Sequence, residues 1–375
     1  MSIFRNRLGS IRVRLIAATM AVGVMAFGLT AVYSIVKMAN IQDAALDTQI
    51  RSQSESGANA AAALLERKLG FARAMGKAIE SIVAMNDDEK RRILDNVVKG
   101  VAQEEGISAA YANFDKGKFF GPGVGTGDNK PGASYFKDGK GEIVMEPSGF
   151  DSPIDSSAGW YWDAIRRERE CLVEPYRYSY REGMDSVLLI SITVPIKVGG
   201  SVAGVAGIDI PLDKLQKLTG EIHPIPGAYA ILVSNQGVRA AHPKPELWMK
   251  RLGDDMTDSA RGALLDAIGD GRAVSVEKPA KGTGKMSRIQ YSPIRIGETN
   301  QPWALGLVFP LDDMREPARL ARRDILIATC LGIGFLAVFL GWLVAKLLKP
   351  LERTAGLMRE MAEGALRASG AEHAL

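Results

Sequence analysis

The chain has 375 residues, of which 46% are hydrophobic and 24% are charged, proportions that are ordinary for globular domains. Lys and Arg number 47 against 43 for Asp and Glu, and no long basic run lies beside aromatic residues, which argues against a nucleic-acid-binding protein. Two cysteines and three scattered histidines supply no disulfide framework, zinc site or catalytic triad. The composition therefore argues against most hydrolases and metalloenzymes, and no cofactor is expected.

Two uncharged apolar runs are predicted to cross a membrane. The first, residues 15–36, covers roughly 33 Å as an α-helix, which is enough for a hydrocarbon core. The second, residues 325–345, carries Trp342 near one end, where an indole ring sits well at the membrane interface. A cleaved signal peptide is the alternative for the first run, although the run is longer than the usual apolar part of such a peptide. A buried core helix is the alternative for the second run.

The charges that flank the two runs predict that both chain ends face the cytoplasm. Arg322 and Arg323 oppose this orientation, but they follow a long segment, and long segments cross the membrane largely regardless of charge. We therefore expect a two-pass protein of the inner (plasma) membrane, with residues 1–14 in the cytoplasm and residues 37–324 outside it. The flanking cations are Arg5, Arg7, Arg12 and Arg14 before the first run and Lys346, Lys349 and Arg353 after the second.

The extracytoplasmic segment begins with a predicted stalk helix over residues 37–84. Proline is absent from it, and apolar residues recur three or four positions apart, as on one face of an amphipathic helix. At 1.5 Å per residue this helix extends roughly 60–70 Å. Asp87 is then expected to cap a second helix.

The sequence pattern of the remainder of this segment predicts short strands separated by glycine and proline. A short helix is predicted at Gly159–Arg169, and the runs CLVEPYRYSY, VLLISITVPI and SVAGVAGIDI predict an antiparallel meander. PLDKLQKLTG predicts a returning helix, after which a smaller set of strands occupies roughly 225–310. The fold class is therefore α+β, with a helical stalk and two modules, at about 85–222 and about 223–310.

The order of these elements resembles the double Cache sensor region of bacterial transmembrane receptors, notably methyl-accepting chemotaxis proteins, over about 37–320. The resemblance implies two stacked PAS-like modules, the first far from the membrane (distal) and the second close to it (proximal), flanked by the two transmembrane helices. The segments that carry it are ISAAYANFDKGKF, GWYWDAI followed by LVEPYRYSY, ITVPIKVGGSVAGVAGIDIPLDKLQ, AILVSNQGVRAAHP and YSPIRIGETNQPWALGLVFP.

After the second span, KPLERTAGLMREMAEGAL resembles the first helix of a HAMP linker, within residues 346–375. Leu351, Thr354, Met358 and Met361 follow heptad spacing, and heptad helices need partners, so a parallel homodimer is expected. A short juxtamembrane amphipathic helix is the alternative. The linker is partial and no adaptor-binding, kinase or cyclase module follows, so a fragment or a natural truncation is expected.

The resemblance also implies a ligand site in the distal module. The amino-acid-binding subgroup carries Arg-x-Trp-Tyr, then a Tyr, then an Asp after the last strand. Trp160 and Tyr161 match the aromatic pair, Tyr176 matches the later Tyr, and Asp209 matches the Asp, whereas Ala158 occupies the Arg position. Because an Arg would clamp a carboxylate with two parallel hydrogen bonds, its replacement makes a free amino acid a weaker candidate.

The matching residues predict an aromatic cage with a carboxylate. Asp209 can pair with an ammonium group while the neighbouring rings cover the cation, so an amine is favoured over an amino-acid-like or purine-like ligand. Asp151 and Asp155 are candidates for the far end of a diamine. The structural alternative places the aromatic residues in the core and Asp209 at a turn. The predicted ligand-binding residues are Trp160, Tyr161, Tyr176, Tyr178, Asp209, Asp151 and Asp155.

These features predict a membrane receptor that senses a small extracytoplasmic ligand and shifts between two conformations. An interaction or scaffold protein that binds a periplasmic partner protein, and no metabolite, is the main alternative. Enzymatic activity is not expected, because no nucleophile–base or metal grouping is present in the sequence.

Overall fold

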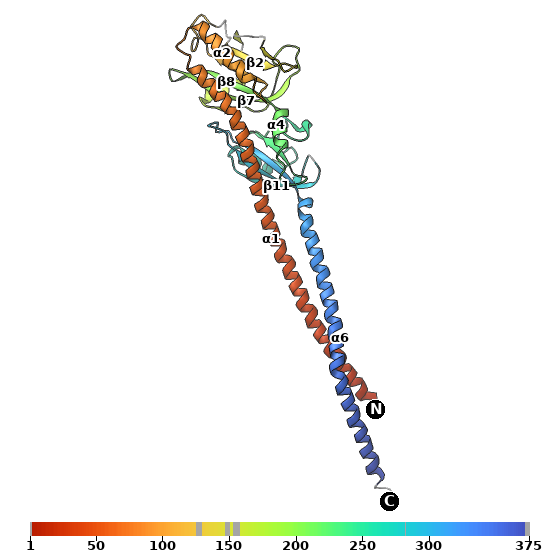
Figure 1. The fold of residues 1–375 in the computed structure, drawn as a ribbon. Helices are drawn as coiled ribbons and strands as arrows, with labels where there is room; N and C mark the ends of the chain where they lie inside the picture. Colours follow the sequence, from red (N-terminus) through yellow and green to blue (C-terminus); the bar gives the residue numbers. More distant parts are fainter. Residues whose placement is uncertain (1, 125–129, 147–150, 153–157, 282, 372–375) are drawn as a thin grey trace. The chain divides into compact units, whose positions relative to one another are not determined.

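The computed structural model describes residues 2–124, 130–146, 151–152, 158–281 and 283–371. The chain forms two compact units. One combines Met1–Leu46 with Arg315–Leu375, and the other is Asp47–Met314. Figure 1 shows the chain as a ribbon and labels some of its helices and strands.

The first unit consists of parts of two long helices, α1 (Ser2–Glu80) and α6 (Leu311–Ala371). Within Ala18–Glu80 and Arg319–Leu343, these helices contain stretches long and apolar enough to cross a membrane. Large apolar side chains of this unit are exposed, with Leu29 at 70% and Phe335 at 74%. Such apolar surface is stable in lipid and unfavourable in water, which agrees with the two predicted spans.

In the second unit, α1 is amphipathic, as its spacing predicts. Leu65, Leu69, Ala72, Met75 and Ile79 are all buried. The stalk helix is therefore confirmed, and it ends at Glu80.

The helix α2 (Asp87–Ala102) follows, with Asn86 as its N-cap. Asn86 Oδ1 accepts a hydrogen bond from the Glu89 N–H at 2.9 Å, so the prediction that Asp87 is the cap is wrong. Asp87 lies in the first turn and accepts from the Gly121 N–H at 3.0 Å instead, which ties α2 to a loop of the same module.

The distal module contains an antiparallel sheet of order β3-β2-β1-β8-β7-β5, with β4 paired to β2 and β6 paired to β7. The predicted meander is confirmed as β6, β7 and β8, and the predicted short helix as α3. The elements are β1 (Ala109–Phe114), β2 (Lys130–Lys137), β3 (Ile143–Met145), β4 (Asp151–Ser152), α3 (Gly159–Arg167), β5 (Cys171–Leu172), β6 (Tyr176–Tyr178), β7 (Val187–Val198) and β8 (Ser201–Pro211).

The proximal module repeats this plan in a smaller antiparallel sheet of order β10-β9-β13-β12-β11. The predicted returning helix, α4, precedes it. The elements are α4 (Leu212–Gly220), β9 (Tyr229–Val233), β10 (Arg239–Ala241), the 3-10 helix η1 (Pro245–Leu247), α5 (Asp258–Gly269), β11 (Val274–Pro279), β12 (Met286–Ile294) and β13 (Trp303–Pro310).

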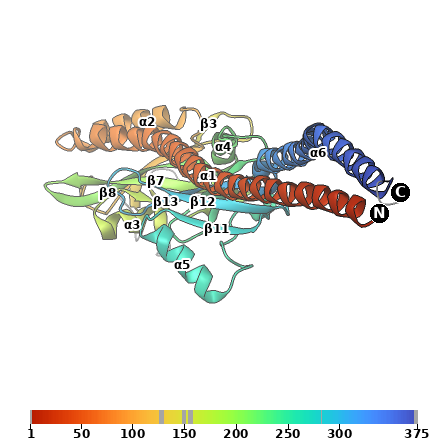
Figure 2. The same cartoon turned by 90° about the horizontal axis from the view of Figure 1, so that it is seen from below.

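Helices cover both faces of the two sheets (Figure 2). Along one face runs α1, whose Gly57 and Gly76 approach Leu305 of β13 and Val194 of β7 so closely that an added methyl group would lie 2.9 and 3.2 Å from them. On the opposite face lie α3 in the distal module and α5 in the proximal module. The predicted α+β class is confirmed, and α3 is placed over the strands that carry the candidate site.

Candidate functional site in the distal module

Strand register brings polar and aromatic side chains together on the face of the distal sheet that α3 covers. Ser191 of β7 lies opposite Asp209 of β8, and Gly207 lies opposite Tyr111 of β1. Residues opposite each other in antiparallel strands point to the same side, and alternate residues along a strand share a face. Tyr176 of β6 lies opposite Leu189, two residues before Ser191, so it belongs to this face as well.

Asp209 is the centre of this arrangement and is only 3% exposed. Its Oδ1 accepts a hydrogen bond from Ser191 Oγ at 2.6 Å, and its Oδ2 accepts one from Tyr180 OH at 2.9 Å. Burial raises the pKa of the Asp209 carboxyl to about 7, against the opposing effect of these two hydroxyl donors. Within the described part of the chain no Lys, Arg or His forms an ion pair with it. The site therefore holds a buried carboxyl solvated by hydroxyl groups alone.

A second layer of aromatic residues lies above this carboxyl. The hydroxyls of Tyr176 and Ser191 are 2.8 Å apart, and because the Ser191 proton is directed to Asp209, Tyr176 is the donor. Tyr178 OH donates to Glu146 Oε1 at 2.8 Å. The chain Tyr176–Ser191–Asp209 thus connects the aromatic layer to the buried acid.

The floor beside Asp209 depends on a glycine. A Cβ at Gly207 would lie 2.4 Å from the ring of Tyr111, so only glycine leaves room for that ring to lie across β8. The Trp160 ring of α3 meets Tyr111 edge-on, with centroids 4.7 Å apart. The Tyr111 hydroxyl is buried near the Ser191 hydroxyl, but no donor or acceptor among the described residues meets hydrogen-bond geometry with it.

The other predicted residues occupy different surroundings. Tyr161 is fully buried and donates to Asp115 Oδ1 at 2.8 Å. Successive residues of a helix point in different directions, so Tyr161 points to a different side from Trp160, whose ring meets Tyr111. Tyr161 packs with Cys171, a free buried thiol whose pKa burial raises to about 11. Asp151 lies in β4, paired with β2, and Asp155 lies outside the described residues.

An open pocket of about 650 Å³ lies against α3, and we call it the α3 pocket. Trp160, Tyr176 and Tyr178 line it, whereas Asp209 lies one hydrogen-bonded layer beneath its wall. The proximal module contributes two glutamines. Its lining residues are Ala158, Gly159, Trp160, Asp163, Arg166, Arg167, Val173, Glu174, Pro175, Tyr176, Tyr178, Gln236 and Gln301.

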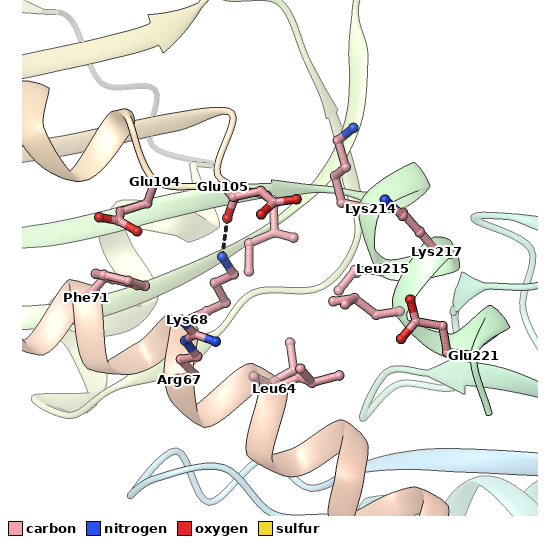
Figure 3. A pocket seen from close by; sticks show the side chains of 14 residues that line it. Leu64, Arg67, Lys68, Phe71, Glu104, Glu105, Lys214, Leu215, Lys217 and Glu221 are labelled. Carbon is pink, nitrogen blue, oxygen red and sulfur yellow. Dashed lines mark hydrogen bonds between the residues drawn. The ribbon is translucent and has the colours of Figure 1, made fainter.

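A smaller pocket of about 300 Å³ lies beside α1 and α4 on the opposite face of the sheet (Figure 3). Lys68 points to the turn after α2 and donates to the main-chain oxygen of Glu105. Burial, and then the neighbouring Arg67, lower the pKa of Lys68. Basic and acidic side chains alternate around this pocket, and the predicted site residues are not among those that line it. The α3 pocket is therefore the better candidate site.

Several residues of the site escaped sequence analysis: Tyr111, Tyr180, Ser191 and Glu174. Ser191 and Thr193 are polar positions inside the otherwise apolar run VLLISITVPI, and this alternation could have identified one face of β7. Tyr111 and Tyr180 carried no such indication, because their place beside Asp209 depends on pairing between distant strands.

Comparison with known proteins places this geometry in context. No family model matches the chain. It is 27% identical to the methyl-accepting chemotaxis protein PscA of Pseudomonas syringae over 62% of the chain, and it spans 35% of the length of that relative, about a third. Methyl-accepting chemotaxis protein X superposes with a TM-score of 0.58 at 20% identity, covering 71% of this chain and 99% of that structure.

The ligand-binding domain of the Pseudomonas fluorescens chemoreceptor CtaA, solved with L-isoleucine, gives a TM-score of 0.51 at 20% identity and covers 73% of this chain and 96% of that structure. The expected resemblance to the double Cache sensor regions of methyl-accepting chemotaxis proteins is thereby confirmed, as distant sequence similarity and as a shared fold.

Proposed function

We propose that this chain is the sensor part of a transmembrane chemoreceptor and that it binds a small amine in the distal module. The observation that carries the proposal is Asp209, a buried carboxyl that hydroxyl groups hold in place and that has no cationic partner among the described side chains. A cation that reaches a buried acid of this kind strongly stabilises its ionised form. The rings of Trp160 and Tyr176 line the pocket directly above and provide faces for that cation.

An amine fits the pocket better than a free amino acid. Ala158 lines the pocket where the resemblance places an Arg, so the bidentate clamp for an α-carboxylate is missing. An amino acid is the second candidate, because Arg167 lines the same pocket from the last turn of α3. A purine-like ligand would stack on the rings but would offer Asp209 neutral N–H donors and no positive charge.

Access to Asp209 runs through Tyr176. Tyr176 lines the pocket and donates to Ser191, which donates to Asp209. An ammonium group therefore reaches the acid only when these two hydrogen bonds rearrange. Tyr176 belongs to β6, which pairs with β7, and β7 also pairs with β5 and β8. Ligand binding therefore favours one arrangement of the sheet, as a two-state receptor requires.

The remaining elements fit a receptor in the inner membrane. The proposal keeps residues 37–324 outside the cytoplasm, with a distal module at about 85–222, a proximal module at about 223–310 and spans at 15–36 and 325–345. It also keeps the partial HAMP linker at 346–375 and a parallel homodimer as the signalling unit. The exposed apolar side chains of the helical unit support the membrane assignment.

Calorimetric titration of the full chain in lipid nanodiscs tests the proposal, with putrescine, butylamine, L-isoleucine and adenine as probes. Asp209→Asn is expected to weaken amine binding about a hundredfold, because the amide keeps the shape but not the charge. Asp213→Asn is the matched control, since Asp213 is exposed and pairs only with its neighbour Lys214 in the described chain. Equal affinities in both variants would remove Asp209 from the site. A wild-type chain that binds none of the probes, but retains a periplasmic protein, would favour the scaffold alternative.

A further inference from the structure

The α3 pocket contains hydrogen-bond acceptors that the proposed amine site leaves unused. Glu174 lies in the connection between β5 and β6 and lines the pocket. Its Oε1 accepts a hydrogen bond from the Gln236 N–H at 3.2 Å. Its Oε2 is buried and has no donor at hydrogen-bond distance within the described part of the chain, although the Ser234 hydroxyl lies close enough to the carboxylate to lower its pKa. The side-chain oxygen Oε1 of Gln301 is buried in the same way and likewise lacks a donor there. Two acceptors at one pocket thus await a donor.

These acceptors belong to different modules. Glu174 is distal, whereas Gln301 immediately precedes β13, and Gln236 lies between β9 and β10 in the proximal module. The contact between Glu174 and Gln236 already joins the modules through one hydrogen bond. A ligand group bound to Glu174 and Gln301 would therefore touch both modules at once.

The residues that line the α3 pocket indicate which kind of ligand group would bind Glu174 and Gln301. Buried acceptors are normally matched by donors, and a group with several N–H donors beside aromatic rings is best supplied by an ammonium ion. Arg166 and Arg167 are the cations of the lining, but Arg166 is paired with Asp163 Oδ1 at 2.5 Å and Arg167 is exposed to solvent, which screens its charge. Burial raises the pKa of Glu174, and a bound cation reverses this effect.

We propose that Glu174 and Gln301 form a second cation-binding pole of the α3 pocket, so that the ligand is a diamine that bridges the distal and proximal modules. The inference rests on the proposed function, because Asp209 holds the first ammonium group. It replaces the expectation that Asp151 and Asp155 hold the far end of a diamine. It also explains transmission, since a ligand held at both poles stabilises one relative position of the modules more than others.

The test compares a diamine with a monoamine on the full chain in nanodiscs. Wild-type protein is expected to bind putrescine at least tenfold more tightly than butylamine in calorimetric titration. Glu174→Gln is expected to abolish this preference while butylamine affinity stays within twofold. Glu182→Gln is the matched control, because Glu182 lies exposed in the turn between β6 and β7. Gln301→Ala gives an independent measurement, since it removes an acceptor that is unpaired in the described structure and so leaves the fold intact.

Each outcome is decisive. Selective loss of putrescine affinity in Glu174→Gln, or in Gln301→Ala should the first variant fail to fold, supports the second pole. Parallel or absent changes for the two amines overturn the second pole and leave the proposed amine receptor standing. A wild-type chain that binds neither amine overturns both proposals together.

Discussion

The central strands β8 and β13 of the two modules end with similar sequences, yet the modules use one position of them in opposite ways. GIDIPLD spans the end of β8 from Gly207, and GLVFPLD spans the end of β13 from Gly306. In this alignment Asp209 corresponds to Val308. Strand register extends the equivalence, because Ser191 lies opposite Asp209 and Ile289 lies opposite Val308.

The same equivalence covers the floor of the site. Tyr111 lies opposite Gly207 in the distal module, and Ile231 lies opposite Gly306 in the proximal one. Ile231 and Val308 pack with Leu264 and Ile268 of α5 in a continuous apolar core. The face that carries a buried acid in the distal module thus holds aliphatic side chains and the rings of Tyr229 and Tyr291 in the proximal module, and this cluster contains no acidic side chain. The comparison shows that a buried carboxyl occupies this strand position in the distal module and an aliphatic side chain occupies it in the proximal module.

The substitution that puts an acid at Val308, the proximal equivalent of Asp209, is expected to have the largest effect on stability. Val308→Asp places a carboxylate in a core cluster that contains no cationic side chain, so we expect the free energy of unfolding to fall by roughly 3–5 kcal/mol. Urea unfolding of the full chain, followed by circular dichroism, measures this. Val308→Ala is the control, which creates a cavity without a charge and should cost about 1–3 kcal/mol. Equal losses in the two variants would contradict the claim that the proximal core excludes charge.

The second-largest expected effect is a pH dependence of stability and of amine affinity that comes from Asp209 in the distal module. The folded-state pKa of Asp209 is raised to about 7, so between roughly pH 4 and pH 7 the folded chain holds a proton that the unfolded chain has lost. The contribution of Asp209 to the free energy of unfolding is therefore largest at low pH and falls as the pH rises through that window. Because an ammonium ion binds the ionised acid, amine affinity should increase about tenfold from pH 6 to pH 8.

Calorimetry at pH 6, 7 and 8 in buffers of different ionisation enthalpy measures both the affinity and the protons released. In Asp209→Asn the increase should disappear. A wild-type affinity that stays flat across this range would show that the acid is already ionised without ligand, or that the ligand does not bind it.

A link between α1 and both modules gives the smallest expected effect. Arg73 of α1 holds Glu170 with two hydrogen bonds, at 2.5 and 2.8 Å, and the Glu298 N–H of the proximal module donates to the same carboxylate at 3.0 Å. Arg73 is partly exposed, so Arg73→Gln should lower the free energy of unfolding by only about 0.5–1 kcal/mol. Thermal unfolding measures the change, and Lys77→Gln, which removes an exposed local pair with Glu80, is the control. A loss above 3 kcal/mol would show that Arg73 supports the core.

The candidate site was predictable only in part. The resemblance to double Cache sensor regions pointed to Trp160, Tyr176 and Asp209, with Tyr178 as a further ring. The three aromatic residues do line one pocket, and Asp209 is hydrogen-bonded beneath it. Tyr161 was grouped with them because it matches the second aromatic position of the same motif, but helix geometry turns its side chain into the core. Glu174 was not singled out, because one acidic residue in a polar connection has no distinguishing pattern until the fold surrounds it with apolar and aromatic walls.

The sequence by itself determined the elements and their order. The long uncharged runs, the 3.6-residue spacing of α1 and the β-branched strands are local patterns, and local patterns specify helices and strands wherever the chain folds. Only the tertiary structure decided which side chains meet. The pairing of β1, β7 and β8 brings together residues separated by as many as a hundred positions, and it sets whether a given strand face holds the Asp209 carboxyl or the Val308 side chain. Contacts of this kind depend on register and packing between distant segments, which no local pattern records.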